Sequence, residues 1–240
     1  MKLMMTLSGD EPTDSIDSIG PIDAYLASQP ITLLAAERLD PDEVATITET
    51  DDAPAVVART GSALRAWWLI DVPTRAAANQ LAQDAPGTGG TLELHEAWTP
   101  QDFGAPADAP TPQPPPVRPG HHRYAAFVDR DLASDASDGR PTEASMAMMD
   151  AYMAPLAEAG TILDGVGLKG TTRSTRFRRA AAQRIVRDGP FTEAKELIGG
   201  YMIVQARTLD EAVDLIRPWL RINRTGQARS STTIEVRRLS

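Results

Sequence analysis

The sequence predicts an α+β protein built of two ferredoxin-like units that pack sheet to sheet as an internal pseudo-dimer. Two observations lead to this fold class. Segments 1–99 and 121–240 repeat the same order of apolar and helical patterns, and a segment rich in Pro and Ala separates them. The most apolar strands are also apolar on both faces, so a layer of helices on one face leaves the other face for a second sheet.

The separating segment, 100–120, is predicted to be a linker. It contains the steps Ala105-Pro106 and Ala109-Pro110 and the run Pro112-Gln113-Pro114-Pro115-Pro116. Proline favours extended polyproline conformation, and such a segment cannot build a packed core. The linker divides the chain into units at 1–99 and 121–240.

Four short stretches of the first unit match stretches of the second unit in the same order. They are Lys2–Leu7 with Arg123–Val128, Ile22–Leu26 with Met149–Met153, Trp67–Ile70 with Tyr201–Val204, and Leu92–His95 with Ile234–Arg237. Helices capped at Thr74 and Thr208 follow the third pair. The shared order predicts an internal duplication.

In the second unit, the hydrophobic period indicates two helices and several strands. The first helix carries apolar residues at helical spacing and stops at Gly160; these residues are Met146, Met149, Met153 and Leu156. The second begins with a capping-box pattern at Thr208 and Glu211 and is expected to end at Pro218. Strands are expected near 123–129, 171–178, 182–187, 199–206 and 232–238. This order is that of a ferredoxin-like unit.

The central strand of the first unit explains why the units should dock. Trp67 and Leu69 point to one face of this strand, while Trp68 and Ile70 point to the other. Burial of such a face contributes on the order of 25 cal/mol per Å² of apolar area. Two sheets placed face to face would enclose a cleft.

The composition limits the classes of function. The chain of 240 residues has 42% hydrophobic and 24% charged residues and no cysteine, which excludes disulfides and cysteine-ligated metals. It has no apolar run of the roughly 20 residues that a membrane span needs, and its N-terminal stretch does not resemble a signal peptide. A cytoplasmic protein without a membrane partner is expected, and no cofactor is indicated.

Charge is distributed unevenly along the chain. The net charge is -9, but 1–99 holds 5 basic and 16 acidic side chains, whereas 121–240 holds 18 and 15. Opposite signs favour docking of the units or binding of an anionic ligand, and both remain open beside a purely solvated surface. Six arginines crowd a predicted hairpin: Arg173, Arg176, Arg178, Arg179, Arg184 and Arg187. The acidic chain and the scarcity of aromatic residues there disfavour nucleic acid.

The most distinctive string runs from Asp188 through Gly189, Pro190 and Phe191 to Glu196, and Gly199-Gly200-Tyr201 follows it. It resembles the signature of YCII-related proteins of the DGPF type, and the resemblance covers most of 122–240. The resemblance implies the dimeric α+β barrel fold but little about activity. Some relatives are proposed to use a paired histidine and aspartate, and others accompany sigma factors of transcription. In the first unit the aligned stretch, Arg59-Thr60-Gly61-Ser62, lacks the motif.

Asp188 is the candidate catalytic residue, because a carboxylate at the start of a Gly-Pro turn can act as a general base or bind a polar ligand group. It can also simply cap the turn. The candidate ligand-binding residues are Arg176, Arg178, Gly189, Pro190, Phe191, Lys195 and Tyr201. His95, His121 and His122 lack the spacing of a metal site, so no metal is predicted. Only these histidines could supply a histidine–aspartate pair.

Three functions remain open at this point. The first is a small-molecule enzyme of the isomerase or lyase kind that uses Asp188, with Arg176, Arg178 or Tyr201 orienting the substrate. The second is a non-catalytic ligand-binding or regulatory module associated with transcription. The third is a structural pseudo-dimer without a ligand. The length of the linker also permits two chains to exchange halves in a homodimer.

Overall fold

The computed structural model describes the chain except for residues 10–18, 52–54, 87–89, 107–112, 131–134, 136–137, 181–182, 191–196 and 227–230, and except for the side chains at 179, 180, 183, 184, 225 and 226. Within the described part, no helix has both the length and the apolar character needed to cross a membrane.

In the part of the first segment that the structure describes there are five strands and two α-helices. In chain order they are β1 (Lys2–Ser8), α1 (Gly20–Ala27), β2 (Thr32–Thr50), β3 (Val56–Ala58), β4 (Leu64–Asp71), α2 (Arg75–Asp84) and β5 (Thr91–Glu96). The Thr74 side chain caps α2 by accepting a hydrogen bond from the backbone N–H of Ala77 at 3.1 Å, as predicted. A short 3-10 helix, η2 (Pro100–Phe103), begins the predicted linker, and residues 113–118 form neither helix nor strand.

The described residues of the second segment form six strands and two α-helices. In chain order they are β6 (His122–Arg130), α4 (Glu143–Glu158), β7 (Ile162–Gly167), the 3-10 turn η3 (Thr171–Arg173), β8 (Thr175–Ala180), β9 (Gln183–Asp188), β10 (Leu197–Ala206), α5 (Leu209–Gly226) and β11 (Ser231–Leu239). The predicted stop of the first helix is confirmed, because Gly160 has a φ of 66° just after α4.

Two expectations for the second segment need correction. Helix α5 does not end at Pro218 but continues to Gly226. Beyond the proline, Trp219 and Leu220 are buried in the core, and this packing offsets the backbone hydrogen bond that proline cannot donate. Strand β7 was not predicted, because Gly165 and Gly167 interrupt its apolar alternation.

All strands join one antiparallel sheet of 11 strands, in the order β7-β10-β6-β11-β2-β4-β1-β5-β8-β9, with β3 on β2. Strand β2 is 19 residues long and links the two parts. Its first part, Thr32–Arg38, pairs with β4, and its second part pairs with β11 from Leu39 to Thr50. The hairpin of β8 and β9 in turn pairs with β5 of the first segment. Each segment therefore lends strands to the other.

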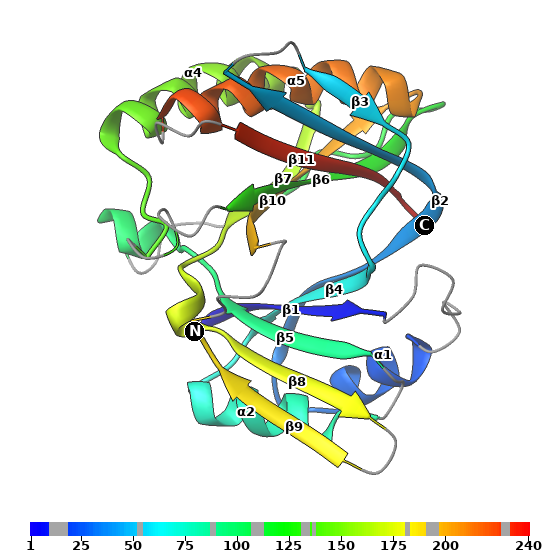
Figure 1. The fold of residues 1–240 in the computed structure, drawn as a ribbon, viewed down its shortest axis with the longest axis vertical. Helices are drawn as coiled ribbons and strands as arrows, with labels where there is room; N and C mark the ends of the chain where they lie inside the picture. Colours follow the sequence, from blue (N-terminus) through cyan, green and yellow to red (C-terminus); the bar gives the residue numbers. More distant parts are fainter. Residues whose placement is uncertain are drawn as a thin grey trace.

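The sheet folds over into two layers with helices on the outside (Figure 1). Helices α4 and α5 cover one layer, and α1 and α2 cover the other. We call the sheet face opposite the helices the inner face. The structure thus confirms a mixed α+β fold with an antiparallel sheet and four helices.

The layers meet in an apolar core to which both segments contribute. Trp67 lies 5.1 Å from Phe127 and 5.4 Å from Tyr201 between ring centroids, and all three rings are buried. Trp68, the next residue, belongs to the core under α1 and α2. The prediction that this strand is apolar and buried on both faces is confirmed, because its two tryptophans are each 0% exposed in different cores.

Candidate functional site

The signature turn follows the last residue of β9 and lies against the loop before β8. The backbone N–H of Gly189 donates to the carbonyl of Ser174 at 3.0 Å. A Cβ atom at Gly189 would lie 1.7 Å from the carbonyl oxygen of Thr171, so only glycine fits at this position. Pro190 is exposed and follows a cis peptide bond. Phe191 and Lys195 lie outside the described residues.

Asp188 lies on the helix-covered face of the sheet. It pairs in register with Thr175, which pairs with Leu94 of the core under α2. Its carboxylate accepts a hydrogen bond from the Thr175 hydroxyl at 3.0 Å, and the residue is exposed. Arg75, the first residue of α2, is close enough to feel its charge. Burial lowers the pKa of Arg75, while Glu96 and Asp188 raise it and so partly offset the effect of burial.

The inner face of the same strands carries a continuous chain of polar side chains from both segments. The Ser174 hydroxyl lies 3.2 Å from Nδ1 of His95, and Nε2 of His95 lies 3.1 Å from Oε2 of Glu93. The other oxygen of Glu93 accepts a hydrogen bond from Arg176, which faces it across β5 and β8. Ser174 and His95 are almost fully buried, whereas the Arg176 side chain is 26% exposed. The chain therefore leads from the surface into the protein.

The carboxylate of Glu93 is held in its ionised form. Burial raises the pKa of Glu93, but the contacts with His95 and Arg176 outweigh burial and lower the pKa below its ordinary value. The ionised Glu93 carboxylate lies 3.1 Å from Nε2 of His95, a short separation without the geometry of a hydrogen bond.

Two of the other predicted site residues lie apart from the polar contacts that link Ser174 to Arg176. Arg178 is exposed and pairs with Thr91 and Ile185, two positions along from Arg176 and hence on the same inner face. Tyr201 lies in the core between the layers, where its hydroxyl donates to Asp164 at 2.8 Å. Burial, followed by the charge of Asp164, raises the pKa of Tyr201. Asp188, Arg176 and Tyr201 therefore do not converge on one point, and their roles stay predictions.

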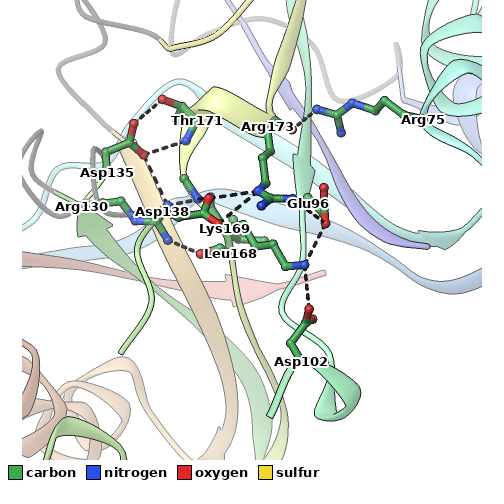
Figure 2. A network of polar contacts seen from close by, with 11 residues as sticks. Arg75, Glu96, Asp102, Arg130, Asp135, Asp138, Leu168, Lys169, Thr171 and Arg173 are labelled. Atoms are coloured by element: carbon green, nitrogen blue, oxygen red, sulfur yellow. Dashed lines mark hydrogen bonds and ion pairs between the residues drawn. The ribbon is translucent and has the colours of Figure 1, made fainter. Parts of the chain in front are cut away.

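The loop from Leu168 to Ser174 fixes the geometry around the turn (Figure 2). Arg130, whose side chain is 4% exposed, donates to the carbonyls of Leu168 and Lys169. Asp135 accepts hydrogen bonds from the backbone N–H of Thr171 at 2.8 Å and from its hydroxyl. Such a buried network is rigid when every member has a partner.

The same loop is bound to the first segment by a buried lysine. The ammonium group of Lys169 lies 2.8 Å from Glu96 and 3.0 Å from Asp102, and it also lies 5.0 Å from the centre of the Trp98 ring. Arg75 also donates to the carbonyl of Arg173 (Figure 2). These contacts hold the loop from Leu168 to Ser174, the turn after Asp188 and strand β5 together.

The arrangement joins a hydroxyl, an imidazole, a carboxylate and a guanidinium, which are the groups that proton-transfer sites use. Among the described residues, no three His, Cys, Asp or Glu side chains gather closely enough to hold a metal ion. Sequence reasoning missed Ser174 and Glu93. The alternation Leu92-Glu93-Leu94-His95 was the available signal, because it sets a charged pair on one face of a buried strand.

Comparison with protein families finds a YCII-related domain at residues 123–220. This range includes Ser174, Arg176 and Asp188 but not Glu93 and His95. The chain is 34% identical over 95 residues to the uncharacterised protein R00369 of Rhizobium meliloti (strain 1021), an alignment that covers 39% of this chain and 77% of that protein.

Proposed function

The chain belongs to the YCII-related family, and we propose that it binds a small molecule at the inner face of β5 and β8. The observation that carries the proposal is the chain of contacts from Ser174 through His95 and Glu93 to Arg176. Buried polar side chains that serve only the fold usually bond to the backbone, whereas these four bond to one another. The relative from Rhizobium is itself uncharacterised, so it suggests no ligand.

The chemistry of these four side chains favours proton transfer on an anionic substrate. We assign the proton of the His95 imidazole to Nε2, which lies 3.1 Å from Glu93, so that the lone pair of Nδ1 faces the Ser174 hydroxyl. Arg176 and Arg178 lie on the same face and suit a carboxylate or phosphate group. This set fits an enzyme of the isomerase or lyase kind, in which His95 exchanges a proton and the arginines orient the substrate.

Asp188 then has a supporting role in the proposed site. It lies on the opposite face of the sheet from His95, and its bond to Thr175 fixes the hairpin that carries Arg176. A dyad of Asp188 with His95 is therefore not part of the proposal, although Asp188 remains the predicted base if the substrate approaches from the exposed side.

The test is a thermal-shift screen of small metabolites, followed by assays for turnover of each molecule that stabilises the protein. We expect His95→Asn to abolish the ligand-induced shift, because the ring nitrogens that meet Ser174 and Glu93 are lost. Asp188→Ala should lower the melting temperature without ligand and retain the ligand-induced shift. If Asp188→Ala alone abolishes the shift, the ligand binds at the turn and the proposed location is wrong.

A purely structural role is the second candidate, and one observation favours it. His95 is only 3% exposed, so a ligand reaches its ring only if neighbouring residues move. In that case no metabolite in the screen changes the melting temperature, and His95→Asn lowers it as any loss of a buried contact does. A binding module without catalysis, including one associated with transcription, would show the shift but no turnover.

We also propose that the two segments are copies packed as an internal pseudo-dimer, with the first copy degenerate. The exchange of strands supports this, since β2 extends the second segment as the β8–β9 hairpin extends the first. Charge supports it too, because acidic residues of the first segment meet basic residues of the second in pairs such as Glu37–Arg123, Glu93–Arg176 and Glu96–Lys169. Separate expression of 1–99 and 121–240 tests it: each half alone should expose its inner face and aggregate, and co-expression should restore a soluble complex.

A further inference from the structure

Strand β9 forms one edge of the sheet and carries two exposed apolar residues (Figure 1). Within the described part of the chain it pairs on one side only, with β8. Ile185 is 52% exposed and Val186 is 46% exposed. An edge strand offers a row of backbone N–H and C=O groups to other strands, and proteins usually protect such edges from association. Two exposed β-branched residues in the middle of this edge therefore leave a surface on which another strand can pair.

The register with β8 determines which residues of β9 offer their backbone groups. The backbone N–H of Gly189 donates to the carbonyl of Ser174 at 3.0 Å, which makes these two residues a hydrogen-bonded pair. Hydrogen-bonded and non-hydrogen-bonded pairs alternate along an antiparallel ladder, so Arg187 and Ile185 direct their backbone groups toward β8. The residues that alternate with them direct theirs to the outer edge; these are Arg184, Val186 and Asp188.

A second copy of β9 fits this edge in an antiparallel register centred on Val186. In a symmetric pair, residues whose backbone groups point outward must face one another, and this register brings together the largest number of them. Val186 then faces Val186 of the second copy, and Arg184 faces Asp188. Opposite charges directly across a strand pair stabilise the pair. A register centred between Ile185 and Val186 would instead set Arg184 opposite Arg187.

Both faces of such a strand pair cover apolar surface. Val186 lies on the helix-covered face, since it pairs with Phe177 of the core under α1 and α2. Ile185 lies on the inner face and would be opposite Arg187 of the second copy. The aliphatic part of an arginine side chain packs well on an apolar residue. Each copy thus covers the apolar residues that the other exposes.

We propose that the protein forms a two-fold homodimer in which β9 of each copy pairs antiparallel with β9 of the other, centred on Val186. The match of Arg184 with Asp188 favours a second copy over an extended segment of an unrelated protein. A contact through one strand of each copy is smaller than the roughly 1,600 Å² of a standard interface, so the dimer dissociates on dilution. The proposal does not rest on the small-molecule site described above.

Sedimentation velocity of the full chain over a range of concentrations measures the self-association. We expect Val186→Lys to weaken it at least about tenfold, because two like charges meet at the two-fold axis and the contact between the valines is lost. Val56→Lys is the matched control, since Val56 is 62% exposed on β3, and it should leave the association unchanged. A protein that stays monomeric at every concentration, or a dimer that Val186→Lys does not weaken, refutes the proposal.

Reversal of charge tests the register. Arg184→Asp and Asp188→Arg each set like charges opposite one another, so each variant alone should be monomeric where the unmodified protein is dimeric. An equimolar mixture of the two variants restores both pairs of opposite charge and should form heterodimers, which weaken as the salt concentration rises. A damaged fold cannot imitate this gain. If the mixture stays monomeric, the register is wrong and the proposed dimer with it.

Discussion

Strands β5 and β11 hold corresponding places in the two segments, and each sets a glutamate and a basic residue on the inner face. In β5 these are Glu93 and His95, and in β11 they are Glu235 and Arg237. The apolar residues between them face the helix-covered cores in both strands. We call the surroundings of these two pairs the β5 junction and the β11 junction. Both have a glutamate and a basic residue, which is histidine in β5 and arginine in β11.

The β11 junction is built as a clamp. The Arg237 guanidinium donates to the carbonyls of Leu64 at 2.5 Å and Ser62 at 2.8 Å and lies 3.0 Å from Glu235. Glu235 in turn accepts from the backbone N–H of Ser62 at 2.5 Å. Because arginine keeps its charge at all relevant pH values and here bonds to backbone, this junction can only hold the chain in place.

The β5 junction is built of side chains that contact one another. His95 contacts the side chains of Ser174 and Glu93. The comparison shows that the basic residue of β5 bonds to side chains, whereas that of β11 also holds two backbone carbonyls. The ends of the two hairpins differ in charge. Asp188, at the end of β9, lies near Arg75 of α2, whereas Arg59, just after β3, pairs with Asp210 of α5.

The largest effect is expected from Arg237→Met. Loss of the guanidinium leaves Glu235 buried without a counter-charge and two carbonyls without donors, which should cost about 3–5 kcal/mol of unfolding free energy. Denaturant unfolding measures this cost. His95→Asn is the matched change in β5 and should cost less, about 1–2 kcal/mol. Equal losses of unfolding free energy in Arg237→Met and His95→Asn would contradict the distinction between the two junctions.

Gly189→Ala comes next, with an expected loss of about 3 kcal/mol, because its Cβ would collide with the backbone carbonyl of Thr171. Gly61→Ala, the corresponding change beside β3, should cost less. Its Cβ would lie 2.4 Å from the Arg237 guanidinium and 2.6 Å from Cγ2 of Val44, and these are side chains, whereas the obstacle at Gly189 is backbone. Gly20→Ala is the control, since nothing lies within 4 Å of its Cβ. Thermal unfolding that ranks Gly61→Ala above Gly189→Ala contradicts this account.

A smaller effect concerns the dependence of stability on pH. The pKa of Glu93 is lowered in the folded protein, so its contribution is complete above its ordinary pKa of 4.5 and is lost as the pH falls through the folded value. Glu93→Gln should therefore flatten the loss of stability below about pH 4.5. Denaturant unfolding at a series of pH values measures the slope. An unchanged slope means that His95 and Arg176 do not hold Glu93 ionised.

The smallest effect is expected from Arg59→Gln. Its side chain is 54% exposed and that of Asp210 is 78% exposed, so the loss of their ion pair should change the unfolding free energy by less than about 0.5 kcal/mol. The reversed charges at the ends of the two hairpins would then reflect the similar geometry of the two segments and would not contribute to stability. A cost above about 1 kcal/mol, measured in high and low salt, would show that this pair holds the segments together.

Much of the fold could be predicted because its signals are local. Alternation and helical period located β6, β9, β10, β11 and the start of α5, and the Thr74 cap marked the start of α2. The signature identified the turn at Asp188 and its glycine. The local signals failed where packing determines the structure. At Pro218 the helix continues because Trp219 and Leu220 are buried in the core.

The sequence by itself determined where most strands and helices form, that certain strands needed cover on both faces, and that a turn follows β9. That this turn requires glycine was decided by the contact of Gly189 with Thr171. Only the tertiary structure decided that Asp188 and His95 lie on opposite faces and that Ser174, Glu93 and Arg176 meet His95. The physical reason is register. Shifting a strand pair by one residue moves every side chain to the other face, and the register between β5 and β8 joins residues some 80 positions apart, beyond the reach of any local pattern.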